Sequence, residues 1–207
     1  MNNYGLDIWG DDNFIIDNGV LKVNYASKPS LISIVNDIRS KGNKGPITLR
    51  FPHLTIKQIN KLYNTFDKSI NEYNYTGKFN AVFPLKVNQL PNFIHPMLEN
   101  SKHLSYGLEA GSKAELILAM AYNNIQCPII VNGFKDKDMI TLAFIAKSLG
   151  HDISLILEGI NELETIIEVQ KELDLPSPSI GLRVRLHSGG SGTWAKSGGI
   201  NSKFGLS

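Results

Sequence analysis

Residues 128–157, PIIVNGFKDKDMITLAFIAKSLGHDISLIL, decide the fold of this chain. The first and last few residues are short apolar runs of strand length. Between them, Met139, Leu142 and Ile145 recur at the spacing of one helix face. Gly150 follows, and glycine is typical of the position just after a helix end. The stretch therefore predicts a strand, a helix and a second strand parallel to the first.

The same unit is repeated along the chain. We predict six strands, at residues 47–51, 79–86, 104–108, 128–132, 153–157 and 180–186. Helical spacing fills the gaps between them. The strands are continuous apolar runs, which is typical of a parallel sheet covered on both faces. A doubly wound sheet and a (β/α)8 barrel both fit this α/β pattern, and the even spacing without a long insertion favours the barrel.

The first forty residues differ from the rest. Strand-like runs at 14–16 and 20–23 flank an Asp-Asn-Gly sequence, which is a hairpin signal, and residues 30–40 have a helical pattern. We therefore separate residues 1–40, the N-terminal hairpin segment, from residues 41–207, which carry the repeat. A complete barrel takes about 250 residues. We expect an incomplete barrel of about six of its eight units.

Composition excludes several classes of protein. The 207 residues include 21 basic and 19 acidic ones, so the net charge of +2 gives no footprint for nucleic acid or an anionic membrane. No apolar run approaches the ~18 residues of a membrane span. The single cysteine, Cys127, cannot form an internal disulfide, which suits a cytoplasmic protein. The five histidines are scattered without ligand spacing, so we predict no metal site.

Lys86 interrupts an otherwise apolar run, residues 81–87, near the end of the second predicted strand. Catalytic groups gather at the carboxyl ends of strands in parallel α/β folds. A desolvated lysine has a lowered pKa and can form a Schiff base with an aldehyde. The spacing is equally compatible with a lysine that points to solvent.

Two carboxylates follow the third predicted strand. Glu109 has no evident structural role and could orient a cofactor or a histidine. Glu115 belongs to Ser112-x-x-Glu115, a capping box in which the serine caps a helix and the glutamate bonds back to the cap. The residues alone favour this structural role for Glu115.

Arg183 and Arg185 lie two residues apart on the last predicted strand and so face the same way. Two arginines at a barrel mouth require anionic partners, either carboxylates or phosphate. An exposed sheet edge that carries charges is the alternative. After them, residues 189–197 nearly match a P-loop and a dinucleotide fingerprint, but glycines follow where both motifs need a helix. We interpret this segment as a loop.

Four stretches in order resemble the biosynthetic arginine decarboxylases, which belong to the fold type III, alanine-racemase-like decarboxylases. One of them, FPLKVNQ at 83–89, resembles that family's pyridoxal-phosphate lysine motif. The others are YGLDIWG at 4–10, GLEAGSKAEL at 107–116, and LRVRL at 182–186 followed by SKFGLS at 202–207. The resemblance spans nearly the whole chain and supports the barrel.

The resemblance implies a role for each matched residue. Lys86 would bind pyridoxal phosphate covalently, and Asn88 would help to shape the cofactor pocket. Glu109 and Glu115 match acidic residues near the cofactor, which favours a functional role for Glu115 beside its structural one. Arg183 matches an arginine in the pocket wall. Lys203 belongs to a loop near an active site shared between subunits.

The implied reaction is decarboxylation of L-arginine to agmatine, which feeds polyamine synthesis. The resemblance also implies Mg²⁺ and a homo-oligomer, and places residues 1–40 with a β-domain of the longer enzyme. A histidine strand, the phosphate loop and the ring-nitrogen acid of that family are expected beyond Ser207, so we expect the chain alone to be inactive. An ornithine or diaminopimelate decarboxylase and a non-enzymatic pyridoxal-phosphate-binding barrel are the alternatives.

Overall fold

The computed structural model describes residues 5–186 and 205–206. The chain divides into two compact units, residues 1–54 and residues 55–207. Helix α3, Pro52–Glu72, begins at the end of the first unit. The Gly-rich segment at 189–197 and Lys203 lie outside the described residues. The boundary after residue 40, which concerns a longer enzyme, stays a prediction.

The first unit is built around a hairpin. Its elements are α1 (Leu6–Trp9), β1 (Phe14–Asp17), β2 (Val20–Val23) and α2 (Leu31–Ser40). Asn18 and Gly19 form the two-residue turn between the strands. Their φ angles are 49° and 77°, and a hairpin turn of this kind requires positive φ at both central residues. Ser30 Oγ accepts a hydrogen bond from Ser33 N at 3.0 Å and caps α2. The predicted hairpin and helix are confirmed.

The predicted strand at residues 47–51 is wrong, because this segment is irregular. Ile47, Leu49 and Phe51 are half-buried, which gives the alternation of a strand. The Phe51 ring contacts Phe14 edge-on, with ring centroids 5.7 Å apart. Strand propensity measures how well side chains fit a half-buried pleated surface. Here the apolar side chains find such packing although the backbone joins no ladder.

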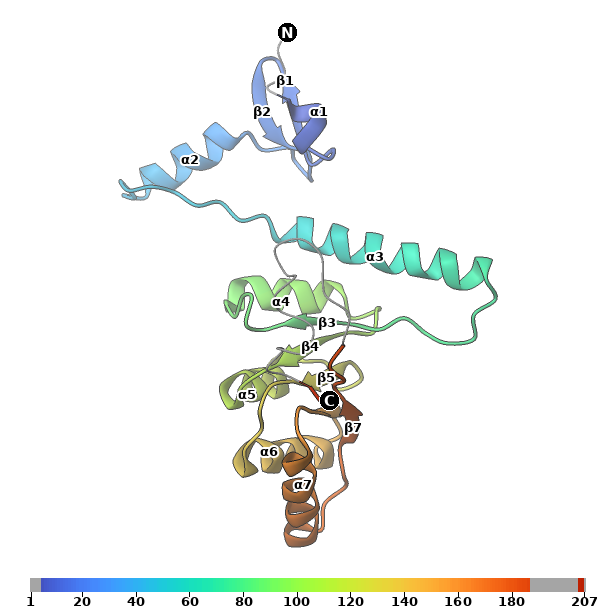
Figure 1. Ribbon diagram of the computed structural model, residues 1–207. Coiled ribbons are helices and arrows are strands. Elements are labelled where there is room, and N and C mark those ends of the chain that lie inside the picture. Colours follow the sequence, from blue (N-terminus) through green and yellow to red (C-terminus); the bar gives the residue numbers. More distant parts are fainter. Residues whose placement is uncertain (1–4, 187–204, 207) are drawn as a thin grey trace. The chain divides into compact units, whose positions relative to one another are not determined.

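The second unit contains a five-stranded parallel sheet (Figure 1). Its strands are, in spatial and sequence order, β3 (Ala81–Pro84), β4 (Tyr106–Ala110), β5 (Pro128–Val131), β6 (Asp152–Leu157) and β7 (Ser179–Leu182). A doubly wound sheet reverses its strand order at a switch point. This order never reverses, as in the wall of a (β/α)8 barrel, which confirms the predicted fold class. The described strands do not close a ring.

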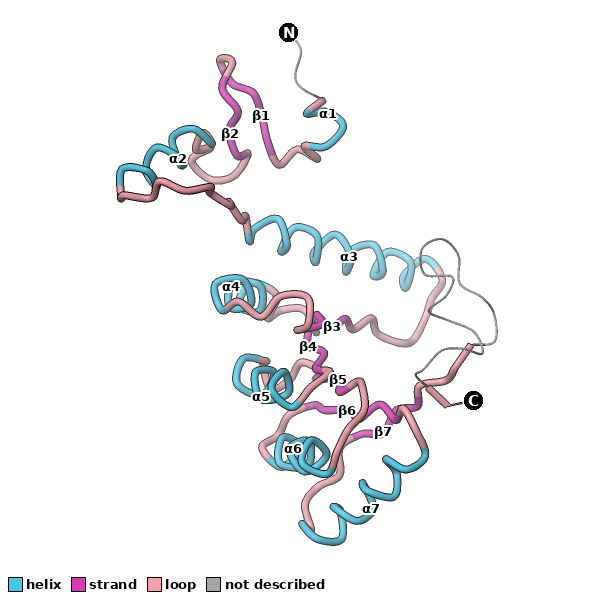
Figure 2. Tube along the Cα trace, turned by 60° about the vertical axis from the view of Figure 1, so that its left-hand side comes forward, coloured by secondary structure: helices cyan, strands magenta, loops and turns pink. Residues whose placement is uncertain are grey.

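Helices cover one face of this sheet. Helices α4 (Pro91–Asn100), α5 (Lys113–Tyr122), α6 (Lys137–Ser148) and α7 (Ile160–Leu173) lie on the same side of the strands (Figure 2). Leu108, Ile129 and Leu155 are fully buried in one core with Phe144 of α6. We predicted that both faces would be covered. In the described part of the chain, the opposite face is instead partly exposed and lines a cleft.

The single cysteine of the chain lies in the second unit. Cys127 is buried just before β5, and burial raises the pKa of its thiol. A protonated, buried thiol is a poor nucleophile, so Cys127 has no catalytic environment.

Among the described helices, none is long and apolar enough to cross a membrane.

We expect His151 to make the stability of the second unit dependent on pH. The side chain is buried after α6, its Nδ1 atom has no hydrogen-bond partner among the described residues, and burial lowers its pKa. The unfolded chain therefore takes up a proton before the folded one does. We expect the free energy of unfolding to fall as the pH drops below about 6.5, the ordinary histidine pKa.

Urea denaturation between pH 7.5 and pH 5 measures this effect. His151→Gln should flatten the pH dependence relative to the wild type. His103→Gln is the matched control, because His103 is exposed and its removal should leave the pH dependence unchanged. Equal pH profiles for the wild type and His151→Gln would contradict the prediction.

Candidate functional site

A cleft of about 740 Å³ lies along the uncovered face and the carboxyl ends of the strands. Its walls come from β3, β4, β6 and β7 and from the loops that follow β3, β4, β5 and β7. The described lining residues are Val82, Pro84, Lys86, Glu109, Gly111, Asn132, Gly133, Ile156, Leu182, Arg183 and Val184. Apolar side chains form the walls and a few charged or polar groups stand among them, which is typical of a small-molecule site.

Lys86 lies in the turn of residues 85–87, directly after β3. The preceding residue, Leu85, is 1% exposed and donates its backbone N–H to Glu109 O at 3.0 Å. This bond fixes the backbone just before the lysine. The Lys86 side chain itself is exposed, yet it is part of the cleft lining. It therefore offers an accessible amine at the strand end.

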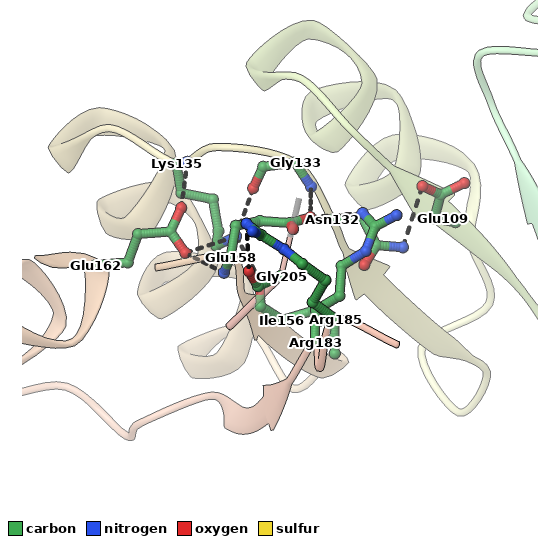
Figure 3. Close-up of polar contacts among 10 residues, drawn as sticks. All are labelled: Glu109, Asn132, Gly133, Lys135, Ile156, Glu158, Glu162, Arg183, Arg185 and Gly205. Atoms are coloured by element: carbon green, nitrogen blue, oxygen red, sulfur yellow. Dashed lines mark hydrogen bonds and ion pairs between the residues drawn. The ribbon is translucent and has the colours of Figure 1, made fainter. Parts of the chain in front are cut away.

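Glu109 stands on β4 with an exposed fraction of 9%. Its Oε1 accepts a hydrogen bond from Asn132 Nδ2 at 3.2 Å (Figure 3). Asn132 follows β5, so the bond ties the ends of two neighbouring strands. The carboxylate thus has a fixed orientation in the cleft, where the sequence predicted a functional acid.

Arg183 lies just after β7, which ends at Leu182, earlier than we predicted. Its guanidinium Nη1 is 2.8 Å from Glu158 Oε1. The expectation of a carboxylate partner is therefore confirmed for Arg183. Arg185 donates from Nη2 to the carbonyl of Gly205 at 3.3 Å and is not among the described lining residues.

Asn88 and Glu115 are not among the described residues that line the cleft. Asn88 Oδ1 accepts from Leu90 N at 3.0 Å, in the turn before α4. Ser112 Oγ accepts from Glu115 N at 3.3 Å, so the predicted serine cap is confirmed. The predicted bond from the Glu115 carboxylate back to Ser112 is wrong, because the carboxylate accepts from Gly111 N, one residue before the cap, at 2.7 Å. These contacts give both side chains a structural role beside the site.

Glu115 also reaches the segment that carries Lys86. Gln89 Nε2 donates to Glu115 Oε1 at 3.2 Å. Because Gln89 lies three residues after Lys86, this contact links the α5 N-terminus to the lysine loop. The cofactor roles implied for Asn88 and Glu115 remain proposals.

The sequence reasoning missed a buried ion pair behind the cleft. The side chains of Lys135 and Glu162 are 0% and 2% exposed, and Lys135 Nζ lies 3.2 Å from Glu162 Oε2. Burial lowers the pKa of Lys135, and the charge of Glu162 opposes this shift. Glu162 Oε2 also accepts from Glu158 N at 2.8 Å. It reaches back from the first turn of α7 to the residue before the Gly159 cap, as Glu115 does in α5. That repeated spacing is a signal that could have revealed it.

Comparisons with known proteins give the family. A family model described as the pyridoxal-binding domain of pyridoxal-dependent decarboxylases matches residues 56–207. The biosynthetic arginine decarboxylase of Prochlorococcus marinus (strain MIT 9515) is 39% identical, in a match that covers 100% of this chain and 33% of that protein. The chain spans about a third of the length of the curated relatives it matches.

Solved structures agree. A crystal structure of the biosynthetic arginine decarboxylase from Campylobacter jejuni has a TM-score of 0.89 at 54% identity, covering 100% of this chain and 33% of that chain. A crystal structure of diaminopimelate decarboxylase from M. jannaschi has a TM-score of 0.70 at 20% identity, covering 95% and 42% of the two chains, and shows a shared fold alone. The resemblance drawn from the four sequence stretches is confirmed, and the chain belongs to the pyridoxal-dependent decarboxylase family.

Proposed function

We propose that a protein containing this chain decarboxylates L-arginine to agmatine and CO2, with pyridoxal phosphate bound at Lys86. One observation carries the proposal: an accessible lysine amine, a fixed carboxylate and an arginine line one cleft at the strand ends of a chain of this family. The arginine decarboxylases that match the chain throughout favour arginine over ornithine or diaminopimelate.

The residues of the cleft fit pyridoxal phosphate. Lys86 supplies the amine that can bond to its aldehyde. Val82, Ile156 and Leu182 supply an apolar wall for a flat ring. Arg183 supplies a fixed cation for its negatively charged oxygens. When bound, pyridoxal phosphate supplies an electron sink for the carbanion that loss of CO2 creates.

The protein's own groups would orient this chemistry. Glu109, held by Asn132, would fix the position of the cofactor in the cleft. Glu115 would hold the Lys86 loop through Gln89. Lys86 would hold the cofactor covalently through its side-chain amine at the end of β3.

Four finer points complete the proposal. We place the reaction in polyamine synthesis in the cytoplasm and expect a homo-oligomer, with Lys203 in a loop near the shared site. Magnesium rests on the family resemblance, because the described residues contain no cluster of three or more His, Cys, Asp or Glu side chains suited to a metal. We expect the 207-residue chain to form little agmatine by itself, since its relatives are about three times as long.

A chimera tests the function. Residues 1–207 replace the matching third of the Campylobacter jejuni decarboxylase, and agmatine formation from L-arginine is measured alongside the decarboxylation of ornithine, lysine and diaminopimelate. We expect activity with arginine in the chimera and little agmatine from residues 1–207 alone. A folded chimera that binds the cofactor but acts on none of these substrates would contradict the proposal and favour a non-enzymatic carrier.

A further inference from the structure

A chain of polar contacts joins the carboxyl ends of four neighbouring strands (Figure 3). Glu109 of β4 accepts from Asn132, which follows β5. The next residue, Gly133, donates its N–H to Glu158 Oε1, after β6, at 3.0 Å. Glu158 Oε1 in turn pairs with Arg183, after β7. One carboxylate therefore connects the loop after β5 to the arginine that lines the cleft.

The Glu158 carboxylate is unusual because it is fully buried. Its side chain is 0% exposed, while that of Arg183 is 45% exposed. The second carboxylate oxygen, Oε2, is buried without a hydrogen-bond partner among the described residues. A buried carboxylate is costly unless it is paired. The 2.8 Å contact between Glu158 Oε1 and Arg183 Nη1 therefore limits the position of the Arg183 guanidinium.

The buried pair behind Glu158 fixes it from the other side. Glu162 accepts from Glu158 N and from Lys135 N, both at 2.8 Å. Lys135 Nζ also donates to the carbonyls of Gly133 and Ile156. These bonds set the backbone of both loops that meet at Glu158. The carboxylate is thus held on a rigid support and not on a free loop.

We propose that Glu158 is a positioning residue that aims Arg183 at the negatively charged oxygens of the cofactor, on a support formed by Lys135 and Glu162. The inference rests on the proposed function, since it requires that the cleft bind pyridoxal phosphate. Glu158 does not line the cleft and acts through Arg183. Loss of its charge should weaken cofactor binding without removing the lysine that carries the cofactor.

The test measures two properties of the chimera that carries residues 1–207 in the Campylobacter jejuni decarboxylase. The first is the pyridoxal phosphate concentration that gives half-maximal borohydride-trapped adduct at Lys86, read by mass spectrometry. The second, which needs no cofactor, is the rate at which phenylglyoxal modifies Arg183. We expect Glu158→Gln to raise the half-saturating concentration of pyridoxal phosphate about tenfold, because about tenfold in affinity corresponds to the loss of one charge-assisted hydrogen bond. The same substitution should speed the modification of Arg183 by phenylglyoxal.

A double-mutant cycle separates positioning from general stability. Arg183→Gln should also weaken cofactor binding about tenfold, and Glu158→Gln should add nothing in that background. Additive losses, or an unchanged phenylglyoxal rate in Glu158→Gln, would overturn the proposal. Glu168→Gln is the matched control, because Glu168 pairs with Lys137 on the exposed side of α7 and should behave as the wild type.

Three other results of this test would each decide about the inference. If Glu158→Gln shows no cooperative thermal transition, Arg183→Gln decides alone, since the position is half-exposed and the glutamine amide can still donate a hydrogen bond to the buried Glu158 carboxylate. Unchanged cofactor binding in that variant would overturn the inference. Absence of any adduct at Lys86 in the wild type would overturn the proposed function and the inference together. A wild type that binds the cofactor and a Glu158→Gln variant that binds it equally well would overturn the inference alone.

Discussion

Lys86→Ala is expected to abolish the borohydride-trapped pyridoxal phosphate adduct and to lower the activity of the chimera by at least about 10³-fold. The physical reason is the loss of the accessible amine at the cleft. The buried Lys135 cannot replace it, because its side chain is 0% exposed and is paired with Glu162. The adduct is measured by the mass of the modified peptide, and the activity by agmatine formation.

Two controls make this result specific. Lys86→Arg keeps the positive charge but cannot form the covalent link, so it should lose the adduct as completely as Lys86→Ala. Lys113→Ala removes an exposed lysine that pairs with Asp136 and Asp138 at the surface, and should behave as the wild type. An adduct that persists in Lys86→Ala at wild-type cofactor concentrations would show that another amine carries the cofactor.

Local patterns in the sequence predicted much of the fold. Helical spacing located α6 and α7, and the Asp-Asn-Gly sequence located the β1–β2 turn, because these features depend on neighbouring residues. The same logic placed Lys86 and Glu109 at strand ends, where the cleft lies, and Arg183 on the last strand, which in the structure ends one residue before it. The strand at residues 47–51 failed because pairing with another strand depends on partners distant in the sequence.

Long-range charge pairing accounts for what was missed at the site. Lys135 and Glu162 are 27 residues apart, and the local sequence does not pair them, although Glu162 stands three residues after its helix cap as Glu115 does. Only the parallel arrangement of β5 and β6 brings their loops together. Glu115 shows the converse: the local sequence predicted its serine cap, while its contacts with Gly111 and Gln89 are found only in the folded structure.

Gly107→Ala is expected to lower the stability of the parallel sheet strongly. A Cβ atom at Gly107 would lie 1.8 Å from the backbone oxygen of Pro128 and 2.8 Å from its carbonyl carbon. Pro128 is the first residue of β5, so the clash is with the backbone of the adjacent strand and no side-chain rotation relieves it. Glycine within a strand often marks such a close approach.

The Gly107→Ala methyl group can be accommodated only if β4 and β5 move apart, which disturbs the ladder that carries Glu109 and the core beneath it. Overpacking of this kind costs about 3 kcal/mol, and urea denaturation followed by circular dichroism measures the loss. Gly111→Ala is the matched control, because a Cβ there would lie 3.5 Å from Glu115 Oε2, an ordinary contact. Equal denaturation midpoints for the two variants would contradict the prediction, since only Gly107 lies against a neighbouring backbone.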